Sequence, residues 1–181
     1  THWTRKSFER VFNQTESDLD MNLVYDVAHN IAKVEKHKVD GEERKLVVHR
    51  KGATRAFPSN RAEIPSKYRD LGQPVLVPGS MGTSSWILLG KSNSMDLSFG
   101  STAHGAGRTM SRSKARRNFT EENVKKSLND KGIFIKALTR DGVVEETPEA
   151  YKDVDSVVNV SHNLGIATKV AKLVPIGVIK G

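Results

Sequence analysis

The segment His104-Gly105-Ala106-Gly107-Arg108 combines a nucleophile with groups that bind phosphate. A neutral imidazole nitrogen can attack phosphorus and hold a phosphorylated group covalently. Small residues let backbone amides approach an anion closely, and the planar fork of arginine matches phosphate oxygens. The segment therefore predicts phosphate chemistry at His104, although a histidine beside glycines is equally typical of an ordinary turn.

Three further segments combine small residues with groups that bind phosphate or metal, namely 26–30, 49–58 and 78–85. Alone, the last is as typical of a plain hairpin turn, and a histidine such as His29 is more often a core residue than a ligand. Together and in this order, the four segments resemble the RtcB family, the RNA-splicing ligases that guanylylate a histidine. The resemblance runs over essentially the whole chain, including the end at Lys180-Gly181.

The resemblance implies a GTP-dependent RNA ligase that joins a 3′-phosphate or 2′,3′-cyclic phosphate end to a 5′-hydroxyl end, as in tRNA splicing and RNA repair. His104 would be the catalytic residue and would carry GMP covalently before an RNA-3′-guanylate forms. The implied nucleotide contacts are His29, Asn30, Pro78, Gly79, Ser80, Met81, Ser85, His104, Gly105, Ala106, Gly107, Tyr151 and Lys180. Lys51, Arg108 and Arg112 would hold RNA phosphates.

The resemblance also implies that His29 binds Mn²⁺, which would polarise the phosphorus under attack. The other ligands of the family, which include a cysteine, have no counterpart here, and the sequence contains no cysteine. We therefore expect residues 1–181 to be the C-terminal part of a single RtcB-type catalytic domain, inactive without the N-terminal part. The resemblance further implies tRNA exon halves as substrates and the archease protein as an activator.

The charge balance favours a polyanionic partner such as nucleic acid. Lys and Arg number 29 against 21 Asp and Glu, which gives a net charge of +8. Between Arg108 and Arg117 there are cations but no acid. No apolar run is long enough to span a bilayer and no signal peptide is visible, so the expected location is the cytoplasm.

The pattern of short apolar runs and turns predicts an α+β fold with mainly antiparallel sheets, hairpins and flanking helices, as part of the larger fold of the family. Hairpins are expected over 33–50, around Asp40-Gly41, and over 133–146, around Asp141-Gly142. Strands over 75–77 and 86–89 would flank the 78–85 loop. Helices are expected over 3–12, 119–128 and 162–171, and His37 is expected on a strand surface.

Two alternative functions remain open. A basic RNA-binding module without catalysis needs only the cations of 108–117, and it leaves the His104 segment and the 78–85 loop unexplained. A histidine-based nucleotidyltransferase acting on a small molecule would need His104 but not those cations. The salt dependence of RNA binding separates the two.

Overall fold

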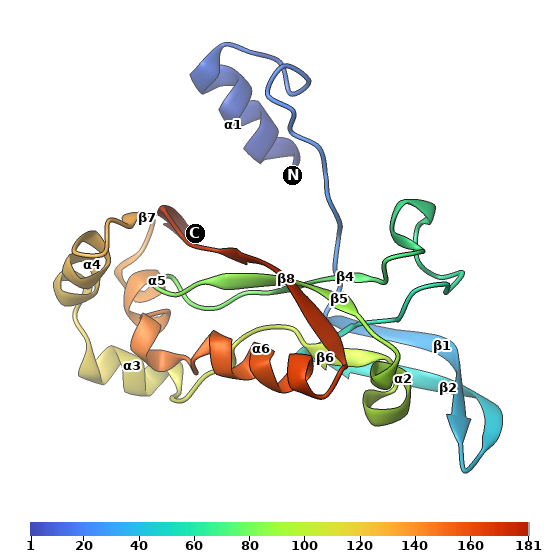
Figure 1. The fold of residues 1–181 in the computed structure, drawn as a ribbon. Helices are drawn as coiled ribbons and strands as arrows, with labels where there is room; N and C mark the ends of the chain where they lie inside the picture. The colour runs from blue at the N-terminus through green and yellow to red at the C-terminus, as the bar shows by residue number, and fades with distance from the viewer. Residues whose placement is uncertain (181) are drawn as a thin grey trace.

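The computed structural model describes residues 1–180 and has the predicted α+β architecture (Figure 1). The helices are α1 (His2–Phe12), α2 (Asn93–Ser98), α3 (Arg112–Asn118), α4 (Glu121–Asn129), α5 (Arg140–Glu145) and α6 (Val154–Asn163), with 3-10 turns η1 (Ser66–Tyr68) and η2 (Pro148–Ala150). The strands are β1 (Asn30–Val39), β2 (Glu42–Lys51), β3 (Ala53–Arg55), β4 (Pro74–Val77), β5 (Ser85–Gly90), β6 (Ser101–Ala103), β7 (Phe134–Ala137), β8 (Ala167–Leu173) and β9 (Gly177–Lys180). They form the sheets β1-β2, β3-β6, β4-β5-β8 and β7-β9. Pairing is antiparallel except between β7 and β9, so the expectation of mainly antiparallel sheets is confirmed.

The long hairpin β1–β2 turns at Asp40-Gly41, as predicted. Both residues have positive φ, 53° and 85°, which suits the tight turns whose twist matches the strands of a hairpin. The ladder runs without a break from Val39 opposite Glu42 to Asn30 opposite Lys51. It therefore holds the chain just after His29 against the chain that leads into β3.

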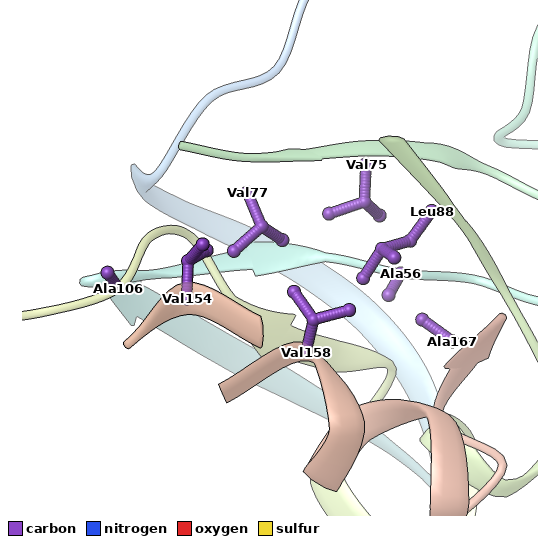
Figure 2. Packing of buried hydrophobic residues seen from close by; sticks show 8 residues of the cluster. All are labelled: Ala56, Val75, Val77, Leu88, Ala106, Val154, Val158 and Ala167. Carbon is purple, nitrogen blue, oxygen red and sulfur yellow. The ribbon is translucent and has the colours of Figure 1, made fainter. Parts of the chain in front are cut away.

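The main core lies between the sheet β4-β5-β8 and helix α6. Figure 2 shows Val154 and Val158 of α6 pointing toward Val75, Val77 and Leu88 of the sheet. Burial of such apolar side chains is the principal stabilising term of a fold. The cluster consists of Ala56, Val75, Val77, Leu88, Ala106, Val154, Val158 and Ala167.

A short ladder, β3–β6, connects the hairpin to the segment that bears His104. It pairs Ala53 with Ala103, which directly precedes His104. Ala56 continues the pairing, since its amide donates to the Gly100 carbonyl at 2.7 Å. The residues after Lys51 and the residues before His104 thus lie side by side.

A second core lies among α4, α5 and β7, and it consists of Met81, Val124, Leu128, Ile133 and Val143, with Val178 of β9 packed against it. Thr120 and Thr139 cap α4 and α5 through their side-chain oxygens. Because Val77 belongs to the first core and Met81 to the second, the loop between β4 and β5 spans both.

Three expectations about local structure were wrong. The predicted hairpin over 133–146 has only its first strand, because Thr139 starts helix α5 at the Asp141-Gly142 segment. The predicted helix over 162–171 is instead the end of α6 and strand β8, separated by Gly165 at φ 67°. His37 is buried rather than on the surface, with 2% of its area exposed.

Helix α1, which matches the predicted helix over 3–12, lies apart from the remaining elements in Figure 1. No residue of α1 is buried within the described part of the chain. Arg5 anchors it to the following segment by donating to the Met21 carbonyl at 2.8 Å. Among residues 1–180 no helix has the length and apolar character needed to cross a membrane.

Leu88→Ala should lower the free energy of unfolding by about 2–5 kcal/mol, because Leu88 is fully buried and its truncation leaves a cavity in the first core. Urea unfolding of the full-length protein measures the change. Leu97→Ala is the matched control, since Leu97 is 59% exposed on α2. An equal loss in both variants would contradict the placement of the core.

Candidate active site and nucleotide pocket

His104 and His29 face each other, although 74 intervening residues separate them in sequence. Their ring centroids lie 4.2 Å apart at an interplanar angle of 66°. The β3–β6 ladder positions both, because β6 ends just before His104 and Thr54 of β3 donates to the Ala28 carbonyl at 3.2 Å. The structure thus brings together the predicted nucleophile and the predicted metal ligand.

The surroundings of His104 keep its imidazole neutral. Burial lowers the pKa of His104 below its ordinary value, and the nearby His29 lowers the pKa further. A neutral imidazole retains the lone pair that attack on phosphorus requires. The position is therefore suited to a nucleophile at neutral pH.

The loop of residues 78–84 is held in a fixed shape by its own hydroxyls. The Ser80 amide donates to Thr83 Oγ1 at 2.7 Å, and the Ser80 and Thr83 hydroxyls lie 2.9 Å apart. Gly79 is required here, because a Cβ would lie 2.1 Å from the Ser84 carbonyl oxygen. A loop fixed in this way can present its amides and hydroxyls to a ligand without reordering.

One backbone hydrogen bond joins this loop to the His104 segment. The Ala106 amide donates to the Pro78 carbonyl at 2.9 Å. Next to it, a Cβ on Gly105 would lie 3.3 Å from the same carbonyl oxygen, so the two segments pack closely. Gly107, at φ 74°, accepts a hydrogen bond from the Lys152 amide, which brings the segment alongside Tyr151.

A cavity of about 360 Å³ lies between the 78–85 loop and strand β9. The predicted nucleotide contacts His29, Asn30 and His104 to Gly107 do not line it. Its volume falls within the range of small-molecule sites. It brings together seven residues predicted to contact the nucleotide: Pro78, Gly79, Ser80, Met81, Ser85, Tyr151 and Lys180. The remaining lining residues are Glu146, Gly177, Val178 and Ile179.

Glu146 is the charged residue among the cavity-lining residues that the sequence analysis did not predict. Its carboxylate accepts a hydrogen bond from the Tyr151 hydroxyl and lies 3.8 Å from Lys180 Nζ. Burial acts to raise the pKa of Glu146, but the Tyr151 hydrogen bond and neighbouring cations outweigh burial and lower it. Residues 143–146 were expected to form a strand, which gave no reason to place Glu146 beside Tyr151 and Lys180. No local motif around Glu146 indicates these contacts.

Arg108 and Arg112 approach the same carboxylate from the cation-rich segment. Arg108 Nη1 lies 3.3 Å from Glu146, and Nη2 donates to the Glu145 carbonyl at 2.6 Å. Arg112 is exposed, and its Nε lies 3.6 Å from Glu146. Lys51 is exposed at the base of the hairpin. Arg112 and Lys51 are thus accessible to a ligand, whereas the guanidinium of Arg108 is held by Glu145, Glu146 and Tyr151.

The described residues do not form a metal site by themselves. Within 1–180 there is no group of three or more His, Cys, Asp or Glu side chains placed to hold a cation. His29 lies beside the imidazole of His104, and a divalent ion takes several ligands. The predicted metal ligation by His29 therefore requires donors from outside this chain.

A family model described as tRNA-splicing ligase RtcB matches residues 1–181. The chain belongs to the RtcB family. Curated relatives named tRNA-splicing ligase RtcB include those of Thermococcus kodakarensis, Nanoarchaeum equitans and Aeropyrum pernix, which are 54%, 52% and 58% identical to it. Each match covers 100% of this chain but only 38%, 38% and 37% of the relative.

Membership of the RtcB family confirms the resemblance drawn from the four segments. The nucleotide, metal and RNA contacts of individual residues stay predictions. Two features of the structure support these predictions. His29 lies beside His104, and residues of the 78–85 loop line the same cavity as Tyr151 and Lys180. Asn30 begins strand β1 and so follows His29 directly into the hairpin.

Glu146→Gln should lower the pKa of Tyr151. Burial raises that pKa first, and the hydrogen bond and negative charge of Glu146 raise it further. The substitution removes only the Glu146 contribution, so the pKa should fall part of the way toward the ordinary tyrosine value. Absorbance titration of tyrosinate, with Tyr151→Phe identifying the signal, measures the shift. An unchanged titration would contradict the contact.

Proposed function

We propose that the full-length protein is a GTP-dependent RNA ligase and that residues 1–181 form the C-terminal part of its single catalytic domain. It joins RNA ends bearing a 3′-phosphate or 2′,3′-cyclic phosphate to ends bearing a 5′-hydroxyl, in tRNA splicing and RNA repair. The observation that carries the proposal is the hydrogen bond from Ala106 to Pro78. It couples a neutral, half-buried histidine to a preformed pocket of nucleotide size.

In the first step, an imidazole nitrogen of His104 attacks the α-phosphorus of GTP. The bond between that phosphorus and the oxygen bridging to the β-phosphate breaks, and pyrophosphate leaves with the electron pair. Gly105, Ala106 and Gly107 leave space for phosphate oxygens against the backbone. GMP is then held on His104 through a phosphorus–nitrogen bond.

A 2′,3′-cyclic end must first add water and break its bond from phosphorus to the 2′-oxygen, which leaves a 3′-phosphate. In the second step, an oxygen of the RNA 3′-phosphate displaces His104 from phosphorus, which gives RNA-3′-guanylate and free imidazole. The 5′-hydroxyl of the other RNA then attacks the 3′-phosphate, loses its proton and releases GMP. Lys51 and Arg112 are exposed cations suited to hold the RNA ends, while Arg108 is held by Glu146 and Tyr151.

The cavity supplies contacts for an uncharged nucleoside. Serine hydroxyls and backbone amides of the 78–85 loop suit the ribose and base edges, and Tyr151 gives an aromatic wall. Lys180 donates to guanine O6 and N7, an arrangement that adenine does not offer. This distinction would make the pocket selective for GTP.

The proposed cofactor is Mn²⁺, held by His29 together with ligands outside this chain. Its chemistry would be charge neutralisation at phosphorus, and no step above is routed through it. The proposed substrates are tRNA exon halves, the proposed activator is archease and the proposed location is the cytoplasm. The isolated piece should not react with GTP.

The pocket argues against one alternative function and the net charge argues against the other. A binding module without catalysis does not need a neutral histidine. It also does not need the hydrogen bond that joins the His104 segment to the 78–85 loop. A transferase for small molecules accounts for both, but not for the net charge of +8. A steep fall of RNA affinity with salt would exclude the small-molecule transferase.

His104→Ala in the full-length protein should abolish covalent GMP and ligation together, because the nucleophile is lost. The measurement is intact mass after incubation with GTP and Mn²⁺. His162→Ala, at an exposed position on α6, is the control and should retain the adduct. Retained GMP on the His104 variant would assign the nucleophile to another residue.

Lys180→Ala should narrow the preference for GTP over ATP by about 10- to 100-fold, which is what one good pair of base contacts contributes. Initial rates of covalent labelling with each nucleotide give the ratio. Lys91→Ala, an exposed lysine after β5, removes the same charge and should leave the ratio unchanged. If the unmodified protein and both variants had equal ratios of GTP to ATP labelling rates, Lys180 would have no part in base selection.

A further inference from the structure

The two faces of the β1–β2 hairpin differ sharply in character. Glu35, His37 and Arg50 point from one face into the protein and are buried. The ladder places the alternate residues on the opposite, outer face, where most side chains are exposed. The outer face carries the opposed pairs Asn30 and Lys51, Ala32 and His49, Val34 and Val47, Lys36 and Lys45, and Lys38 and Glu43.

One of these pairs sets two positive charges against each other. Lys36 and Lys45 are direct cross-strand neighbours, an arrangement that destabilises a sheet. Lys36 is compensated by Glu43, at 2.8 Å. Lys45 and Lys51 form no ion pair with any residue of the described chain 1–180. An anionic ligand on this face would supply the missing negative charge.

The two lysines, unpaired within residues 1–180, lie along one line that leads away from His29 and His104. Lys51 lies opposite Asn30, which directly follows His29, and the ring of His29 contacts that of His104. From Lys51 the same face carries His49, Val47 and then Lys45, a distance of about 20 Å at the usual rise of a strand. A hollow of about 600 Å³ at the base is lined by Asn30, Ile31, Ala32, His49, Arg50 and Lys51.

The hairpin is also held in a fixed position relative to His104. Arg50 binds both carboxylate oxygens of Glu35, at 2.7 and 2.8 Å. The same guanidinium donates to the Ser101 hydroxyl and to the Phe99 carbonyl, at 2.8 Å each. Because Ser101 begins β6, the cations of the outer face keep a constant distance from the end of that strand.

We propose that the outer face of the β1–β2 hairpin, from Lys51 through His49 to Lys45, binds the phosphodiester backbone of the substrate RNA as it leaves the reactive site. This inference rests on the proposed function and extends the RNA contact of Lys51 to a surface several nucleotides long. RNA is favoured over an acidic protein segment because the face begins at the site where an RNA end would react.

The test uses the full-length protein and two single-stranded RNAs with a 3′-phosphate, one of a few nucleotides and one several times longer. Lys45→Ala should raise the Kd for the long RNA about 5- to 10-fold and reduce its salt slope by about one. The short RNA should bind as before, because it does not reach Lys45. Lys45→Arg, which keeps the charge, should keep the affinity.

Arg44→Ala is the matched control. Arg44 is adjacent in sequence, is exposed and carries the same charge, but it pairs with His37 on the opposite side of the ladder. It should bind the long RNA as the unmodified protein does. Equal weakening by the Lys45 and Arg44 substitutions would reduce the effect to net charge and overturn the proposal.

An unchanged affinity of Lys45→Ala for the long RNA would also overturn the proposal and favour an acidic protein as the partner of this face. Self-guanylylation with GTP is measured in parallel and should be the same in all variants. Loss of the histidine adduct in the unmodified protein would instead contradict the proposed function. RNA binding does not require the adduct, so the two failures are distinguishable.

Discussion

The buried ion pair between Arg50 and Glu35 is the interaction on which the arrangement of the site depends. Burial acts to raise the pKa of Glu35, but the hydrogen bonds from Arg50 and His37 outweigh it and lower that pKa. Removing one partner of such a pair leaves an uncompensated buried charge, which typically costs about 3–5 kcal/mol. Arg50 also reaches Ser101 and Phe99, so one guanidinium fixes the hairpin, β6 and thereby His104.

The nucleotide pocket depends on a different constraint, the packing of two separate cores. The loop between β4 and β5 leaves the first core at Val77 and enters the second at Met81. Its hydroxyls fix its local shape, while the two cores fix its ends. The position of the pocket relative to His104 is then set by the hydrogen bond from Ala106 to Pro78 on one side and by that from Lys152 to Gly107, next to Tyr151, on the other.

Features set by local chemistry could be predicted from the sequence. The Asp40-Gly41 turn predicted the β1–β2 hairpin correctly. The roles of the His104 segment and of the 78–85 loop stay predictions, which rest on the family resemblance. The hairpin turn predicted at Asp141-Gly142 is wrong because the preceding Thr139 caps a helix. Val143 and Val144 are buried as residues of helix α5 rather than of a strand. The choice between turn and helix at that point depends on the second core, which no local pattern displays.

Contacts between distant segments could not be predicted in this way. Glu146 acquires its role only because Tyr151, Lys180 and two arginines converge on it from different elements. The parallel pairing of β7 with β9 likewise joins segments that lie far apart in sequence. The family resemblance predicts Tyr151 and Lys180 as nucleotide contacts without their geometry, and the fold places the Glu146 carboxylate beside both.

The pairing of β9 with β7 has a consequence for the order in which the site is completed during synthesis. Every other residue that lines the cavity precedes β9 in the chain, so the ribosome makes that wall last. The β1–β2 hairpin can form while β9 is still in the exit tunnel. Neither core can be complete at that point, because Ala167 of the first core closely precedes β9 and Val178 of β9 packs against the second core. A nascent chain would then carry a formed hairpin before it has a nucleotide pocket, and the pocket would be completed only after β9 emerged.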